Sequence, residues 1–253
     1  MDTEVIGNKL RINLLNVPVD IISPQQLAPF VYDLLKTEKE HNIVLLSLWD
    51  LLRARRNREY RDYVLRASLI VPISKSIISG IKFLTGDKAF RYMPFDFIVS
   101  LLTILEKREY SCYLLGGKNK ILQKTEKNIR QTFPKLRVVG RFPGFFKRRE
   151  EATIIQAIKK ASPSLLLAGK GIRGEEKWIP RNNASLGKGM RLWCSDIFDV
   201  FAEKKKYPSR SAFDNGLEWI GYCFHNPLKF LRIFPYIGYK FQLLGCKIFS
   251  GGG

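Results

Sequence analysis

Two glycine clusters stand where predicted strands end, and their positions favour a phosphorylated ligand. Gly116 and Gly117 lie between a predicted strand and a predicted helix, and Gly169 and Gly171 follow a second predicted strand. Glycines at such turns let the backbone approach a ligand, and the amides at a helix start favour a phosphate. Left-handed turns also need glycine for steric reasons alone, so both interpretations stay open.

Two adjacent acids, Glu175 and Glu176, follow the second glycine cluster and open a predicted helix. Carboxylates beside a ligand-binding turn are candidates for proton transfer. Acids in a first helical turn also complement the helix dipole, which is a purely structural role. The sequence leaves these two roles open.

The elements that must position these residues alternate between strands and helices. Ser23 is predicted to cap the first helix, with Pro24 in its first turn. Strands are predicted over 11–19, 43–46, 69–71, 111–115, 136–139, 164–168 and 190–194, and helices over 25–37, 51–66, 76–84, 95–107, 118–133 and 150–161. This order predicts the α/β class, with a Rossmann-like, mostly parallel sheet and helices on both faces.

A change of composition near residue 200 predicts two parts. Residues 1–200 would form the Rossmann-like domain, and 201–253 a helical appendage that associates with a membrane. Between 217 and 249 there are nine aromatic residues and four Lys or Arg against one acid. Aromatic side chains mixed with cations suit the headgroup boundary of a bilayer. Pro227 and Pro235 are predicted to divide this segment into short helices.

The chain is strongly basic: 43 Lys and Arg against 23 Asp and Glu give a formal net charge of +20. Such an excess implies an anionic partner, either nucleic acid, a phosphorylated substrate or acidic lipid. The sequence has no helix-turn-helix, RRM, KH or zinc-finger signature. We therefore expect no nucleic acid, and a phosphorylated substrate and an anionic membrane surface stay as the expected partners.

The four cysteines are far apart and only two histidines are present, so a Cys/His zinc site is not expected. No apolar run reaches the ~18 residues that a spanning helix needs. Together with the absence of a secretory signal pattern, this predicts a protein that is soluble or lies on a membrane, and reduced thiols fit a cytoplasmic compartment.

Several segments, taken in order, resemble the WecG/TagA/CpsF glycosyltransferases. The resemblance covers about residues 10 to 240. It is carried by YLLGGK at 113–118, FPKLRVVG at 133–140, PGFF at 143–146, EKWI at 176–179, FDVF at 198–201, GLEW at 216–219 and NPLK at 226–229 with Arg232. Members of this family transfer a sugar from a nucleotide sugar to a polyprenyl-pyrophosphate-linked sugar on the cytoplasmic face of bacterial membranes.

The resemblance implies a set of partners and site residues. The donor would be a UDP-sugar and the acceptor a polyprenyl-pyrophosphate-linked saccharide, with Lys229 and Arg232 near the acceptor pyrophosphate. Neither a metal nor another cofactor is expected, and a homo-oligomer is possible. Arg91 and Glu175 are the candidate catalytic residues, and the candidate donor-binding residues are Ser47, Gly116, Gly117, Gly169, Gly171 and Glu176.

The sequence departs from the family at the positions that would carry the chemistry. Ile73 stands where the family has its proposed catalytic aspartate, and isoleucine cannot accept a proton. Ser47 replaces an asparagine, and Glu175 replaces a glutamine. Either another residue has taken over the base role, with Ser47, Asp50, Ser74 and Glu175 as the candidates, or the chain is a non-catalytic relative. Such a relative would bind a lipid-linked glycan or scaffold an active transferase.

Overall fold

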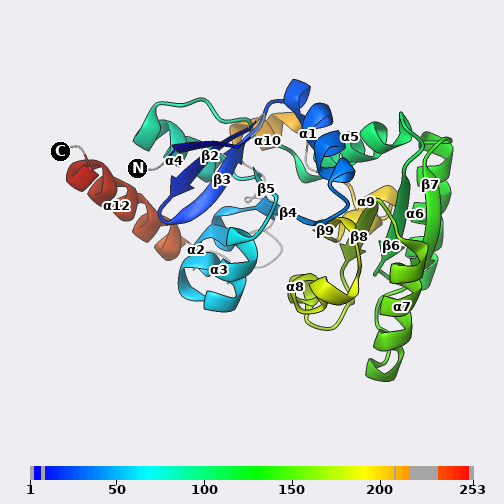
Figure 1. Cartoon of the computed structure of the whole chain (residues 1–253). Helices are drawn as coiled ribbons and strands as arrows, with labels where there is room; N and C mark the ends of the chain where they lie inside the picture. The colour runs from blue at the N-terminus through cyan, green and yellow to red at the C-terminus, as the bar shows by residue number, and fades with distance from the viewer. Residues whose placement is uncertain (1–2, 7–8, 208, 217–232, 251–253) are drawn as a thin grey trace.

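A six-stranded sheet forms the centre of the molecule. The computed structural model describes residues 3–6, 9–207, 209–216 and 233–250. The strands are β4 (Glu40–Leu46), β5 (Leu69–Pro72), β6 (Ser111–Leu115), β7 (Arg137–Phe142), β8 (Leu165–Gly169) and β9 (Gly189–Ser195), in the order β5-β4-β9-β8-β6-β7 (Figure 1). Every neighbouring pair in this sheet is parallel.

Helices cover both faces of the sheet, because alternate side chains of each strand are apolar on opposite faces. Leu114, for example, packs in one buried cluster and Leu115 in the other. One cluster includes α1 (Pro24–Lys36), α5 (Pro94–Glu106), α6 (Asn119–Thr132) and α9 (Ile197–Phe201); the other includes α2 (Leu48–Arg56), α3 (Arg58–Leu65), α4 (Lys75–Thr85), α7 (Glu151–Ala161) and α8 (Trp178–Asn182). The predicted α/β class with a mostly parallel sheet is confirmed.

The prediction of one strand over 11–19 was wrong. The segment forms a hairpin of β2 (Lys9–Leu14) and β3 (Val17–Ile21), which pairs with β1 (Thr3–Ile6) in a separate antiparallel sheet. The turn residues Leu15 and Asn16 both have positive φ, at 52° and 65°. Two-residue hairpin turns of this kind usually carry glycine, and the sequence here has none to mark the turn.

The prediction of one helix over 51–66 was also wrong, because Asn57 divides it. Asn57 ends α2 in an extended conformation, and its side-chain oxygen accepts a hydrogen bond from the Tyr60 amide at 2.8 Å, which caps α3. At α1 the predicted start is confirmed: Ser23 caps the helix and Pro24 occupies its first turn. The other predicted elements each match one observed element to within a few residues.

Asp20 ties the hairpin to the parallel sheet. Its fully buried carboxylate accepts hydrogen bonds from Lys9 Nζ and Arg11 Nε on β2 and from the Ile70 amide on β5, each at 2.7 Å. Burial lowers the pKa of Lys9, and the charge of Asp20 partly offsets this effect. These hydrogen bonds therefore hold the antiparallel sheet against β5, the strand at one edge of the parallel sheet.

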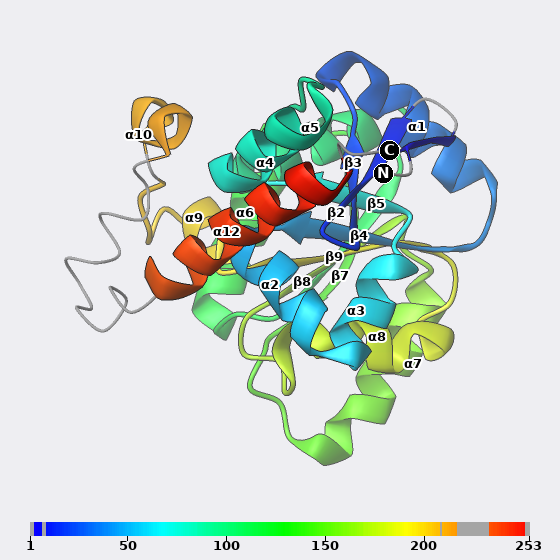
Figure 2. The same cartoon turned by 90° about the vertical axis from the view of Figure 1, so that its left-hand side faces the viewer.

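The described part of the predicted appendage contains α10 (Arg210–Asn215) and α12 (Ile233–Ser250), and Figure 2 shows α12 running across the molecule beside α4. Tyr239 is fully buried, and its hydroxyl donates to the Ser76 carbonyl at 2.9 Å. A Cβ atom on Gly80 would lie 2.2 Å from this hydroxyl, so α4 accepts the tyrosine only because residue 80 is glycine. The division at residue 200 stays a prediction.

The prediction of short helices was wrong for the part of the tail after Pro235, where α12 continues unbroken for 18 residues. Pro235 lies in the first turn of α12, where the missing amide hydrogen costs no helical hydrogen bond. Pro227 lies outside the described residues. Of the helices that the structure describes, α12 included, none is both long and apolar enough to cross a bilayer.

Replacing Asp20 with Asn should destabilise the fold strongly, because Lys9 would stay buried without its counter-charge. We expect the free energy of unfolding to fall by about 3–5 kcal/mol, measured by urea denaturation. Asp33→Asn is the matched control, since Asp33 pairs with Lys36 on the exposed surface of α1 and should change stability by less than about 1 kcal/mol. Equal effects of the two variants would contradict this account.

Candidate active site

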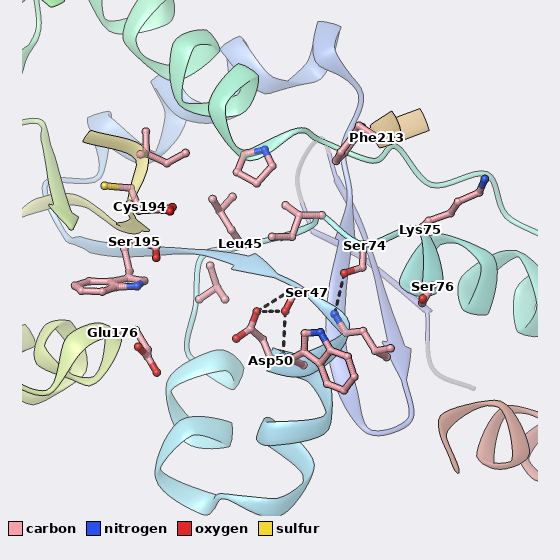
Figure 3. A pocket seen from close by; sticks show the side chains of 18 of the residues that line it. Leu45, Ser47, Asp50, Ser74, Lys75, Ser76, Glu176, Cys194, Ser195 and Phe213 are labelled. Atoms are coloured by element: carbon pink, nitrogen blue, oxygen red, sulfur yellow. Dashed lines mark hydrogen bonds between the residues drawn. The ribbon is translucent and has the colours of Figure 1, made fainter. Parts of the chain in front are cut away.

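A large cavity opens at the carboxyl ends of β4, β5 and β9, where parallel sheets commonly bind ligands. Its volume is about 1190 Å³. The strand ends, the first turns of α2 and α4, the 3₁₀ turn Glu175–Lys177 and the start of α12 all line it. We call it the central cavity; Figure 3 shows part of its lining.

Hydrogen bonds between neighbouring loops fix the floor of the central cavity. The Ile73 amide donates to the Leu46 carbonyl at 3.0 Å, and the Leu48 amide donates to the Ser74 hydroxyl at 2.9 Å. Leu46 pairs with Pro72 at the ends of β4 and β5, so Ser47 and Ile73, the next residue of each chain segment, are neighbours. Both line the cavity, so Ile73, which is predicted to stand at the position of the family's aspartate, lies in it.

A half-buried carboxylate lies beside this floor. Asp50 Oδ2 accepts hydrogen bonds from the Ser47 hydroxyl at 2.5 Å and from the Ser47 amide at 2.9 Å (Figure 3). Burial raises the pKa of Asp50, the charge of Glu176 raises it further, and the hydrogen bonds from Ser47 act in the opposite direction. The structure thus brings together two of the residues considered as substitutes for the missing base.

The two glutamates predicted as site residues also line the central cavity. Glu176 forms an ion pair with Arg53, whose guanidinium stacks over the Tyr60 ring at 4.4 Å. Glu175 is exposed and has a left-handed backbone, with φ of 50°. Glu176 is therefore held in a fixed position, whereas Glu175 reaches solvent.

Lysines line the central cavity and add positive charge to it, which the sequence did not single out. They are Lys75 on α4, Lys205 and Lys206 after α9, and Lys240 on α12. Lys75 Nζ donates to the Asn215 carbonyl at 3.0 Å, and Lys205 pairs with Asp196. The sequence shows these lysines only as members of a basic chain, and the fold is needed to gather them.

The glycine clusters pack against each other. The Gly116 amide donates to the Phe142 carbonyl at 2.9 Å and the Gly117 amide to the Lys170 carbonyl at 2.7 Å, so both amides already have partners. A Cβ atom on Gly116 would lie 2.6 Å from the Gly169 carbonyl oxygen. These contacts support the steric reason for glycine here, and the donor-binding role of Gly116, Gly117 and Gly169 stays a prediction.

Gly171 lines a second, more open hollow of about 630 Å³. Its backbone approaches the Phe145 ring so closely that a Cβ atom would lie 2.6 Å from it. Glu175 lines both this hollow and the central cavity, so the two adjoin at that residue.

Arg91 is not among the residues that line the central cavity. Its Nε donates to the Ile73 carbonyl at 2.9 Å, and its guanidinium also donates to the Phe213 carbonyl and stacks on the Phe213 ring, 3.6 Å from its centre. These contacts join the loop after β5 to α10, so Arg91 positions two residues that do line the cavity. Its catalytic role stays a prediction.

Lys229 and Arg232 lie outside the described residues. Among the residues that the structure does describe, no three of His, Cys, Asp and Glu gather closely enough to hold a metal ion.

Comparison with known proteins matches residues 12–248 to the glycosyl transferase WecG/TagA/CpsF family. Proteins of Staphylococcus aureus strains NCTC 8325 and COL are similar to this chain, each 20% identical over 222 residues, which make up 87% of this chain and 87% of each relative. Both relatives carry the name N-acetylglucosaminyldiphosphoundecaprenol N-acetyl-beta-D-mannosaminyltransferase.

Replacing Arg91 with Met should loosen α10 and lower stability, because two backbone carbonyls lose a charged donor. We expect the free energy of unfolding to fall by about 2 kcal/mol and proteolysis within 202–216 to become faster. Arg108→Met is the matched control, since exposed Arg108 stacks on the Tyr32 ring at 3.8 Å. A folded Arg91→Met protein of unchanged stability and protease resistance would refute the positioning role.

Proposed function

The chain belongs to the WecG/TagA/CpsF family of glycosyl transferases, and we propose that it transfers a sugar from a UDP-sugar to a polyprenyl-pyrophosphate-linked saccharide in bacterial cell-surface polysaccharide synthesis. The observation that carries this proposal is the set of residues that line the central cavity. Ser47, Ile73, Glu175 and Glu176, which the family resemblance assigns to the site, come from three different loops and line this one cavity.

The size of the central cavity supports two substrates. Pockets for a single small ligand typically measure about 300–1,000 Å³. At about 1190 Å³ the cavity exceeds that range, which leaves room for a nucleotide sugar and the terminal sugar of an acceptor together. The names of the Staphylococcus relatives include a diphosphate-linked acceptor sugar, in agreement with an acceptor of this class.

The distribution of charge in the cavity supports a diphosphate leaving group. Lys75, Lys206 and Lys240 line the cavity together with Asp50 and Glu176. Ammonium groups in the cavity neutralise the negative charge that develops as UDP departs. In the proposed reaction these lysines, rather than a metal ion or another cofactor, supply that charge.

The outward face of α12 supports the proposed location at the inner surface of the bacterial plasma membrane. Phe234, Phe241 and Ile248 are 67%, 67% and 71% exposed and recur every seven residues, so they share one side of the helix. Ile237 and Leu244 extend this apolar stripe. Exposed aromatic and aliphatic side chains beside lysines suit the boundary between lipid headgroups and acyl chains.

A transfer assay tests the proposed activity. Purified protein is incubated with polyprenyl-diphosphate-linked N-acetylglucosamine and a panel of UDP-sugars, including UDP-N-acetylmannosamine, and lipid-linked product is measured by mass spectrometry. We expect one UDP-sugar to give a product longer by one sugar and an equal amount of UDP. Binding of the lipid acceptor without any product would instead support the non-catalytic relative.

Sedimentation with anionic liposomes tests the proposed membrane face. The double variant Phe241→Ser, Ile248→Ser should bind liposomes at least tenfold more weakly, because each apolar side chain contributes about 1.5 kcal/mol or more when buried in lipid. The control is Leu65→Ser, which removes an apolar side chain that is 44% exposed on α3. If the double variant binds as tightly as this control, α12 is not the membrane face.

A further inference from the structure

Transfer of a sugar to a hydroxyl group needs an acceptor for the hydroxyl proton, and Ile73 cannot serve. The inference below therefore rests on the proposed function. Of the residues that the structure describes, four carboxylates line the central cavity: Asp50, Glu175, Glu176 and Asp196. A general base for the transfer should have no cation paired with it, should be shielded from water and should lie close to Ile73.

Three of the four fit poorly. Glu176 is paired with Arg53, and Asp196 with Lys205, so the charge of each is already balanced by a neighbouring cation. Glu175 is exposed and lies between the central cavity and the outer hollow. A base that must work in a water-excluded site is better placed elsewhere.

Asp50 fits on geometry. Ser47 stands beside Ile73 at the ends of β4 and β5, because Leu46 and Pro72 are register partners. Adjacent strands lie about 4.8 Å apart. The Asp50 carboxylate, in the first turn of α2, accepts hydrogen bonds from the Ser47 hydroxyl and amide at 2.5 and 2.9 Å, so a carboxylate lies beside the residue that neighbours Ile73.

Asp50 also fits on electrostatics. Burial and the nearby Glu176 both raise the pKa of Asp50, which makes its carboxylate a stronger base than that of an exposed aspartate. Arg53 on α2 and the buried Tyr60 on α3 are other ionisable groups around this carboxylate, and the hydrogen bond with Tyr60 lowers the pKa of Asp50. Arg53 is directed to Glu176 by its ion pair.

We propose that Asp50 is the general base of the transfer and that Ser47 positions it. The oxygen of the acceptor hydroxyl forms a bond to the anomeric carbon of the donor. The bond from that carbon to the phosphate oxygen breaks, and its electron pair leaves with UDP. The hydroxyl proton passes to a carboxylate oxygen of Asp50. Atoms and charge balance without any further reagent, and attack from the side opposite UDP inverts the anomeric centre.

The transfer assay with the best UDP-sugar of the panel tests this assignment. Asp50→Asn should lower kcat by about 10²- to 10⁴-fold, the usual contribution of general base catalysis, and change the KM for the donor little. Asp62→Asn is the matched control, because Asp62 is exposed on α3, and it should keep full activity. Circular dichroism and thermal melting confirm that both variants are folded.

A rescue separates catalysis from a structural effect. Adding Ile73→Asp to the Asp50→Asn protein returns a carboxylate to the adjacent strand end, and we expect it to restore part of the lost kcat. A purely structural defect at Asp50 would not respond to a carboxylate at residue 73.

The pH dependence provides a second readout that does not need the Asp50 variant to fold. Activity should fall as pH decreases through the raised pKa of Asp50, since the protonated carboxyl cannot accept a proton. Glu176→Gln removes a nearby negative charge and leaves Arg53 without its partner. Both changes lower the pKa of Asp50, so the acid limb of the kcat profile should move to lower pH.

The outcomes are distinguishable. A wild-type chain that forms no product with any donor overturns the proposed function. An active wild-type chain overturns only the assignment of Asp50 if folded Asp50→Asn keeps full kcat, or if the acid limb stays fixed in Glu176→Gln. Loss of kcat in Asp50→Asn, its partial return with Ile73→Asp and the shifted acid limb support the assignment.

Discussion

The contact between the loops that follow β4 and β5 is the constraint on which the candidate site depends. One backbone hydrogen bond from Ile73 to Leu46 and one from the Leu48 amide to the Ser74 hydroxyl join the two loops. They place the start of α2 against the end of β5, so Ser47, Asp50 and Ile73 border the same space. The carboxyl ends of parallel strands lie at the same edge of the sheet. Leu48 and Ser74 can therefore form a hydrogen bond although they are 26 positions apart in the sequence.

Most of the fold could be predicted from the sequence because its elements carry clear local signals. Buried strands such as β5 are continuous apolar runs, and helices such as α1 begin with a recognisable cap. Two errors arose where the signal was weak. Leu15 and Asn16 adopt a turn without glycine, and Asn57 ends one helix while capping the next, so neither break interrupts the apolar pattern.

The candidate site was less predictable, since its parts depend on tertiary packing. A glycine beside a strand end has the same sequence signature whether it binds phosphate or admits a neighbouring backbone. Only the structure shows that the Gly116 and Gly117 amides have carbonyl partners. Likewise, no spacing rule brings Lys75 and Lys240 to one cavity. The opposite holds for Asp50, whose capping contact with Ser47 is local and could be anticipated from their spacing of three residues.

The helix α12 contributes both to the central cavity and to the proposed membrane face. Tyr236 and Lys240 are four residues apart and line the central cavity, whereas Phe234, Phe241 and Ile248 project from another side of the same helix. Tyr239, held in the notch at Gly80, fixes the rotation of α12 about its axis, so the lining face and the exposed face cannot exchange. A lipid surface that met the apolar stripe would therefore lie next to the cavity that receives the head of a lipid-linked acceptor.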